Sequence, residues 1–204
     1  MRILVLGGTR YFGVHLVNGL LELGHEVTIA TRGNTKDTFG DSVKRVIVDR
    51  SDEKAMAETF AGKGYDIVCD NIAYCSNDVR NILSNVSCKR YIMTSTMSVY
   101  EELKMDLKEE EMDTTKKELI WCDRNAYGYD VIKQQAEAAL FQAYQDVDSA
   151  AVRFPFVIGE DDYTKRLYFY VEHVVKEKPM YVNNLESWNW LQRILRKKRK
   201  PLIL

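Results

Sequence analysis

The sequence predicts an α/β fold in which a doubly wound parallel sheet carries helices on both faces. Two observations lead to this prediction. At the start of the chain, an apolar run at residues 2–6 leads into a glycine-rich turn, a helical pattern and a second apolar run, within about thirty residues, the length of a βαβ unit. Further along, short β-branched runs alternate with amphipathic helical stretches, which is typical of a parallel sheet.

The bulk composition narrows the classes of protein. At 204 residues the chain is long enough for one well-buried domain with a small appendage. Its net charge of -1 gives no general attraction to nucleic acid or anionic membranes, so nucleic acid is an unlikely partner. The sequence has no apolar run of about 18 residues and no signal-peptide layout, so we expect no membrane partner and a cytoplasmic location. Four cysteines without a C-x-x-C pair and three scattered histidines predict a reduced protein with no metal site.

The glycine-rich turn at residues 7–13 is the first candidate site. Gly7 allows a sharp turn after the strand, and Gly13 allows the next helix to pack close to that strand. Unpaired N–H groups at a helix start point toward a bound phosphate, and the helix dipole favours its negative charge. The turn therefore predicts a pyrophosphate site, with a purely structural turn as the alternative. The candidate cofactor contacts here are Gly7, Thr9, Arg10, Tyr11, Phe12 and Gly13.

The helix after this turn ends at Gly24, a typical C-terminal cap, and residues 26–30 form a second β-branched strand. Thr31 and Arg32 follow, at the point where such folds contact the adenosine ribose. An acidic residue there accepts from the 2′-hydroxyl of NAD, whereas a cation and a hydroxyl suit the 2′-phosphate of NADP. The sequence therefore favours NADP over NAD as the cofactor. The alternative is that Arg32 is only a solvated loop residue.

Residues 45–48 form the third predicted strand, and Asp49 follows it. Ser51 is the expected N-cap of a helix that ends near Phe60. Asp49 lies at the carboxyl end of a strand, where ligands of open α/β sheets bind, and its carboxylate can accept from the adenine amino group. A turn residue before the helix is an equally good interpretation of Asp49.

Two more strands, at residues 66–69 and 90–94, flank a helix at about residues 77–83. Ala73 follows the first of these strands, and Thr96 lies just beyond the second. Right-handed crossovers place the carboxyl ends of all these strands at the edge that holds the glycine-rich turn. We therefore expect Ala73 near the cofactor and Thr96 near the substrate.

The rest of the chain begins with a strongly charged stretch at residues 101–118. A solvated loop is the preferred interpretation, and a flap over the substrate is the alternative. A helix at about residues 127–144, a sixth strand at 149–153 and a further helix at about 164–175 are expected to follow.

Tyr129 and Lys133 provide the candidate chemistry. They lie four residues apart on a predicted helix and therefore share one face. A tyrosine has a pKa of about 10, too high for a base at neutral pH, and a nearby ammonium lowers that value. Tyr129 can then exchange a proton with a substrate hydroxyl, Thr96 can hold the same oxygen, and Lys133 can also bond the cofactor ribose. Because this spacing occurs on many helices, the interpretation depends on the motifs that precede it.

Four motifs together resemble the extended branch of the short-chain dehydrogenase/reductase superfamily, the NAD(P)-dependent nucleotide-sugar epimerases and dehydratases. These motifs are residues 7–13, 95–100, 129–133 and 153–159, in the family's order. The resemblance implies a Rossmann-like fold, NADP or NAD as cofactor, a nucleotide sugar as the small-molecule substrate, and the homodimer that is usual for relatives. It also implies that Tyr129 is the general acid/base, assisted by Lys133 and Thr96.

Two features depart from the family pattern. Arg10 stands where the family has a middle glycine, and its cation either strengthens phosphate binding or marks a divergent member. The chain is also shorter than extended members, so we expect a dinucleotide-binding domain at residues 1–160 and a truncated substrate lobe at residues 161–204. The lobe ends in a basic tail at residues 196–200, after an apolar helical stripe formed by Trp188, Leu191, Ile194 and Leu195.

These departures keep a second class of function open. The alternative to an enzyme is a non-catalytic dinucleotide-binding module, either a regulator or an RNA-associated scaffold, or an inactive truncated enzyme. Cofactor binding without turnover is the property that distinguishes this alternative from catalysis.

Overall fold

The structure is a computed structural model, and it describes residues 1–102, 104, 106–159 and 161–179. The chain divides into two units, Met1–Asp161 and Asp162–Leu204. The first unit contains the sheet and every predicted site residue, and the described part of the second contains one helix, α5, Arg166–Val175. The predicted apolar stripe of the tail and its basic residues lie outside the described residues.

All the strand pairs of the sheet are parallel, which confirms the predicted fold class. The order across the sheet is β3-β2-β1-β4-β5-β6. The chain therefore builds outward from β1 in one direction and then from β4 in the other, and ligands of such sheets bind at the carboxyl ends beside this reversal. The strands are β1 (Arg2–Leu6), β2 (Glu26–Thr31), β3 (Val43–Ile47), β4 (Gly64–Asp70), β5 (Ser87–Thr96) and β6 (Asp148–Phe154).

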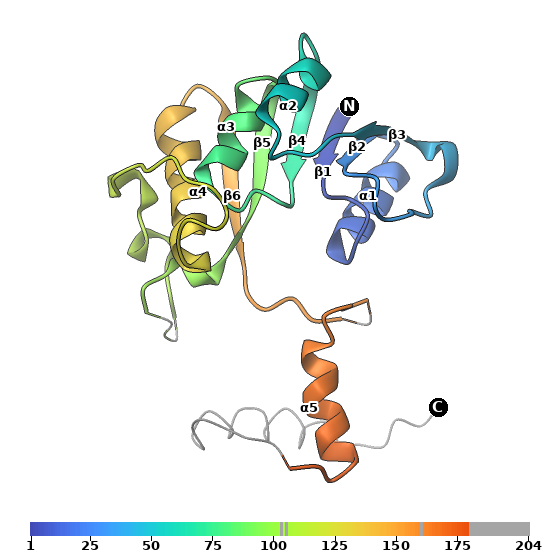
Figure 1. The fold of residues 1–204 in the computed structure, drawn as a ribbon, viewed down its shortest axis with the longest axis vertical. Helices are drawn as coiled ribbons and strands as arrows, with labels where there is room; N and C mark the ends of the chain where they lie inside the picture. Colours follow the sequence, from blue (N-terminus) through green and yellow to red (C-terminus); the bar gives the residue numbers. More distant parts are fainter. Residues whose placement is uncertain (103, 105, 160, 180–204) are drawn as a thin grey trace. The chain divides into compact units, whose positions relative to one another are not determined.

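Helices cover both faces of the sheet because side chains alternate along each strand. On one face, Ile3 and Val5 of β1 pack with Val17 of α1, Phe12–Glu22. On the other face, Leu4 and Leu6 belong to a core shared with α2 (Glu53–Phe60), α3 (Ser76–Leu83) and α4 (Tyr129–Ala143). Figure 1 shows these last three helices grouped on one side of the strands. The alternate residues of β1 therefore belong to two separate cores, one under the helices on each face.

Several element boundaries differ from the sequence-based expectation. The third strand runs from Val43 to Ile47, so it starts and ends earlier than the predicted residues 45–48. Its two cationic residues lie in the strand with exposed side chains. The N-cap of α2 is Asp52, whose carboxylate accepts from the Ala55 N–H at 2.9 Å, and not Ser51. Thr96 is the last residue of β5 and not a residue beyond it.

The helix that carries Tyr129 also begins later than expected. Residues 127 and 128 precede it, because Gly128 has an extended backbone with ψ 157 and serves as the N-cap of α4. Tyr129 is consequently the first residue of the helix and Lys133 lies about one turn further along. This arrangement leaves the Tyr129 side chain at the open end of the helix, where it is 49% exposed.

Most described residues of the charged stretch at 101–118 are exposed, as expected for a solvated loop, but its second half is anchored to the domain. Met112 and Thr114 are buried. The Gln142 amide of α4 donates to the main-chain oxygens of Thr114 (2.8 Å) and Lys117 (2.9 Å). The apolar and hydroxyl side chains between the charges therefore fix this part of the segment against α4.

Cys69 of β4 is buried, and burial raises its thiol pKa to about 11, so it packs as a small apolar core residue. Among the helices of the described ranges, none is long and apolar enough to cross a membrane.

Candidate functional site

The glycine-rich turn joins β1 to α1 and has the backbone geometry that only glycines allow. Gly7 has φ 79, and a Cβ built there would lie 2.6 Å from Cγ2 of Ile72. A Cβ on Gly13 would lie 2.6 Å from the Gly7 main-chain oxygen. Gly8 has a similar constraint that the sequence did not reveal, because its Cβ would lie 2.8 Å from Cγ2 of Val17 in α1. The close approach of the turn to the helix fits the cradle that a pyrophosphate needs.

The other residues predicted in this turn lie around it. Thr9, Tyr11 and Phe12 are half-buried, and the Phe12 ring lies 6.0 Å from the Phe154 ring at the end of β6. Arg10 is exposed, and its Nε donates to Oγ1 of Thr35 at 2.9 Å. Arg10 therefore reaches from the turn to the loop after β2, where the adenosine end of a dinucleotide is expected.

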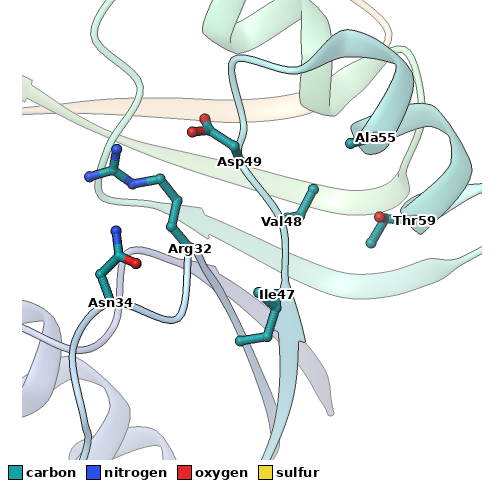
Figure 2. Close-up of a pocket in the computed structure, with 7 residues that line it drawn as sticks. All are labelled: Arg32, Asn34, Ile47, Val48, Asp49, Ala55 and Thr59. Carbon is teal, nitrogen blue, oxygen red and sulfur yellow. The ribbon is translucent and has the colours of Figure 1, made fainter.

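An open recess of about 470 Å³ lies at the carboxyl ends of β2 and β3 (Figure 2). In Figure 2, the guanidinium of Arg32 and the carboxylate of Asp49 lie on the same side of the recess. Thr31, just before Arg32, is half-buried, and its Oγ1 accepts from the Gly33 N–H at 3.2 Å, which shapes the loop. The recess is lined by Arg32, Asn34, Ile47, Val48, Asp49, Ala55 and Thr59.

Asp49 acts as a turn residue before α2, which was one of the two interpretations of its sequence position. Its Oδ1 accepts from the Ser51 hydroxyl at 2.6 Å and from the Ser51 N–H at 3.0 Å. These bonds hold the pKa of the Asp49 carboxyl below its ordinary value, and the charge of Arg32 contributes in the same direction. An ionised acceptor and a cation therefore share the recess, and contact with adenine remains a prediction.

Lys133 links α4 to the carboxyl ends of β4 and β5. Its side chain is only 3% exposed, and Nζ donates to the main-chain oxygens of Ala73 (2.7 Å) and Thr94 (2.8 Å). Burial lowers the Lys133 pKa from 10.5 to about 8, and the nearby Asp70 charge opposes that effect. The ammonium is thus held beside the carboxyl ends of β4 and β5. An ammonium has three N–H donors, and these two main-chain oxygens accept from two of them.

Thr96 and Tyr129 complete the predicted trio. Oγ1 of Thr96 accepts from the Ser98 N–H at 3.1 Å and donates to the Ser98 hydroxyl at 3.2 Å, which caps a short 3₁₀ turn after β5. Tyr129 shares a helix face with Lys133, and its ring lies 6.2 Å from the Tyr74 ring. The fold therefore brings Ala73, Lys133 and the end of β5 together, with the Tyr129 phenol at the exposed end of α4.

A buried ionic network next to this site was not predicted. Arg50, after β3, donates to both carboxylate oxygens of Asp70 at 2.6 and 2.8 Å, and the Tyr91 hydroxyl donates to Asp70 at 2.7 Å. Arg50 also contacts Asp78 at the start of α3 at 3.2 Å, and Arg124 contacts Asp78 at 3.0 Å. A charged residue that closes an apolar strand, as Asp70 closes β4, was the only signal in the sequence.

A second buried pair fixes the far side of α4. Glu137 is fully buried, and its carboxylate accepts from Arg153 of β6 at 2.7 Å and from the Ser95 hydroxyl at 2.5 Å. Arg153 also donates to the main-chain oxygen of Met112 at 2.9 Å, and its guanidinium lies over the Tyr100 ring at 4.8 Å. This pair attaches the charged segment to the sheet, next to the predicted substrate site.

Within the described ranges, no group of three or more histidine, cysteine or acidic side chains could hold a metal ion.

Comparison with known proteins gives a family and a fold. A family model described as the NAD dependent epimerase/dehydratase family matches residues 3–191. The chain is 30% identical over 120 residues to the chloroplast stem-loop binding protein of 41 kDa b from Arabidopsis thaliana, an alignment that covers 52% of this chain and 31% of that protein.

Solved structures resemble the chain in fold. A UDP-glucose 4-epimerase of Thermotoga maritima with UDP-glucose has a TM-score of 0.66 at 18% identity, covering 90% of this chain and 66% of its own. The enzyme WbmG of Bordetella bronchiseptica in complex with NAD has a TM-score of 0.66 at 15% identity, covering 89% and 61%. The chain therefore spans about a third of the curated relative and less than two thirds of these structures.

Proposed function

The chain belongs to the NAD dependent epimerase/dehydratase family, and on this premise we propose that it binds NADP and acts as an epimerase or dehydratase on a nucleotide sugar. The observation that carries the proposal is the buried ammonium of Lys133, held by Ala73 and Thr94 one helical turn from Tyr129. Burying a charged lysine costs free energy. A buried lysine beside the edge of the sheet where ligands bind therefore points to a functional role.

In this proposal the residues of the chain have separate tasks. The glycine-rich turn binds the pyrophosphate, and Lys133 bonds the ribose hydroxyls with its remaining N–H. Tyr129 takes a proton from a substrate hydroxyl and returns it, and Thr96 holds the same oxygen in line. When bound, the nicotinamide ring would accept a hydride from the substrate carbon and could return it. The phenol is suited to proton exchange because its ring is exposed at the end of α4, where a substrate can approach.

A preference for NADP is supported by the cations at the adenosine end. Arg32 lines the recess with Asn34, and Arg10 is directed toward the same loop by Thr35. A 2′-phosphate brings about two negative charges, which two guanidinium groups can neutralise with charge-assisted hydrogen bonds. Asp49 in the same recess repels a phosphate, so the preference depends on Arg32 in particular.

The cofactor preference is tested by titrating the protein with NADP and with NAD. Arg32→Ala is expected to weaken NADP binding about tenfold, the size of one charge-assisted bond, and to change NAD binding less than about twofold. Lys36→Ala, an exposed cation of the same loop, is the matched control and is expected to change neither. Tighter NAD than NADP binding by the unaltered protein would refute the preference.

Catalysis is tested by single-turnover measurements of hydride transfer with a panel of sugar nucleotides. Tyr129→Phe is expected to lower the rate at least about a hundredfold, because general acid–base catalysis contributes that much. Tyr127→Phe is the matched control, since Tyr127 is equally exposed and lies two residues earlier, outside α4. A rate that is unchanged by Tyr129→Phe would contradict the assignment of the acid/base.

A non-catalytic RNA-associated module is the second candidate. The observation that favours it is the similarity to a protein named for stem-loop binding, although the net charge of -1 gives no general attraction to RNA. Fluorescence anisotropy with an RNA stem-loop at two salt concentrations, with and without NADP, tests it. Salt-dependent RNA binding together with cofactor binding and no turnover would favour the module. A homodimer and a cytoplasmic location remain predictions, as does a substrate lobe after residue 160.

A further inference from the structure

Tyr74 lies where the loop after β4 meets the first turn of α4. Its half-buried ring packs against a small core of Cys75, Cys122 and Ile132. The Tyr129 ring meets it edge to face, with 6.2 Å between ring centroids and an interplanar angle of 60°. The Lys133 ammonium lies over the same ring, 4.9 Å from its centroid. One aromatic side chain thus contacts both residues of the proposed acid/base pair.

The surroundings hold this ring from its backbone and from its face. The Tyr74 N–H donates to Oδ2 of Asp78 at 2.7 Å, and Asp78 is buried. The same carboxylate accepts from Nε of Arg124 at 3.0 Å, and the Arg124 guanidinium lies 4.8 Å from the centroid of the Tyr74 ring. Asp78 therefore orders both the main chain of Tyr74 and a cation over its face.

The ammonium of Lys133 is the group most affected by this ring. The charges that act on it are Asp70, Asp78 and Glu137, which favour the charged form, and Arg50, which disfavours it. An aromatic face is attractive to a cation, most strongly when water is excluded. Edge-to-face aromatic pairs also stabilise each other beyond the area that they bury. The ring is consequently placed to fix the ammonium and the phenol relative to each other.

We propose that Tyr74 is a positioning residue for Tyr129 and Lys133: its ring gives the phenol an edge-to-face neighbour and the ammonium an aromatic face, so both are ordered before a ligand binds. The inference rests on the proposed function for the roles of that pair. It differs from the proposed function in its test, because the contact with Lys133 can be measured without turnover.

The test is an NMR titration of the Lys133 side chain in protein with isotope-labelled lysine, with the signal assigned by its loss in Lys133→Met. Tyr74→Leu keeps apolar bulk around the ammonium and removes the aromatic face. Because the charged form loses its partner, the Lys133 pKa is expected to fall by about 0.4 or more. Tyr74→Phe retains the ring and is expected to leave it unchanged. If Tyr74→Leu does not fold, Tyr74→Met provides the same comparison.

Tyr65→Leu is the matched control, because that half-buried tyrosine also lies under a cation, Arg2 at 5.5 Å, but at the amino end of β4. A Lys133 pKa that is the same in Tyr74→Leu and in the unaltered, equally folded protein would overturn the inference. Where turnover is measurable, kcat is expected to fall about threefold or more in Tyr74→Leu, with KM little changed. A shifted Lys133 pKa in a protein without turnover supports the positioning role and refutes only the proposed function.

Discussion

The buried pair of Arg50 and Asp70 gives the sharpest prediction about stability. Asp70 is fully buried, and its two oxygens accept two bonds from Arg50 and one from the Tyr91 hydroxyl. Burial alone raises an acid's pKa, but the Arg50 charge and these bonds hold the pKa of Asp70 below its ordinary value. Asp70→Asn keeps the shape of the side chain and removes its charge, so Arg50 loses its principal partner in the interior.

The magnitude follows from what remains around Arg50. Breaking a buried pair on one side costs about 3–5 kcal/mol, because a buried charge is left uncompensated. Arg50 still contacts the Asp78 carboxylate at 3.2 Å and donates to the Asp78 main-chain oxygen at 2.8 Å. We therefore expect the lower end, a loss of about 3 kcal/mol, which is a large part of the 5–15 kcal/mol that stabilises a typical domain.

Urea unfolding followed by circular dichroism at pH 7 measures this loss. The matched control is Asp66→Asn on the same strand, whose carboxylate pairs with the exposed Lys89 at 2.7 Å, and its loss is expected to destabilise the protein far less. In a double-mutant cycle with Arg50→Met, the coupling is expected to be about 2 kcal/mol. Equal losses for Asp70→Asn and Asp66→Asn, or additive effects in the cycle, would refute the reasoning.

The same pair also predicts the response to acid. The folded pKa of Asp70 is lowered, so its stabilising contribution is present above the unfolded value of about 3.9 and is lost as the pH falls through the folded value. The difference in free energy of unfolding between the unaltered protein and Asp70→Asn is therefore expected to shrink below about pH 4. A difference that stays constant down to pH 2.5 would contradict the assignment.

Three further predictions concern α4, α2 and the charged segment. The folded pKa of Lys133 is about 8, so between about pH 8 and 10 the unfolded chain binds this proton while the folded protein has released it. Over this range the free energy of unfolding of the unaltered protein is therefore expected to rise relative to that of Lys133→Met, as measured by urea unfolding. A difference that does not change with pH would contradict this. Asp52→Ala is expected to lower the free energy of unfolding by about 1 kcal/mol and Ser51→Ala by less, since Asp52 is the N-cap; the reverse order would restore the earlier assignment. Arg153→Met is expected to speed trypsin cleavage within residues 101–118 several-fold, and unchanged cleavage would show that other contacts hold the segment.

The site could be predicted in outline because most of its signals are local. The Gly7 to Gly13 spacing reports a turn whose shape is determined within a few residues, and the structure has the close approaches that it implies. The spacing of Tyr129 and Lys133 likewise determines that they share a helix face. Their roles in catalysis, and the contact of Asp49 with adenine, stay predictions because they depend on a ligand. Sequence patterns did not predict a role for Tyr74 or Arg124, because nothing in their immediate neighbours distinguishes these half-buried side chains from other tyrosines and arginines.

The sequence by itself determined the order, type and buried faces of the elements, because a period of two or of 3.6 residues follows from local backbone geometry. Only the tertiary structure decided which distant groups meet. Arg50 reaches Asp70 across 20 residues, and Lys133 reaches Ala73 across 60. Element ends were also decided there, as at Asp52 and Gly128, because caps depend on which side chain or backbone group lies within bonding distance. A buried charge is tolerated only where the fold brings it a partner, and that condition is not visible in the pattern of the chain.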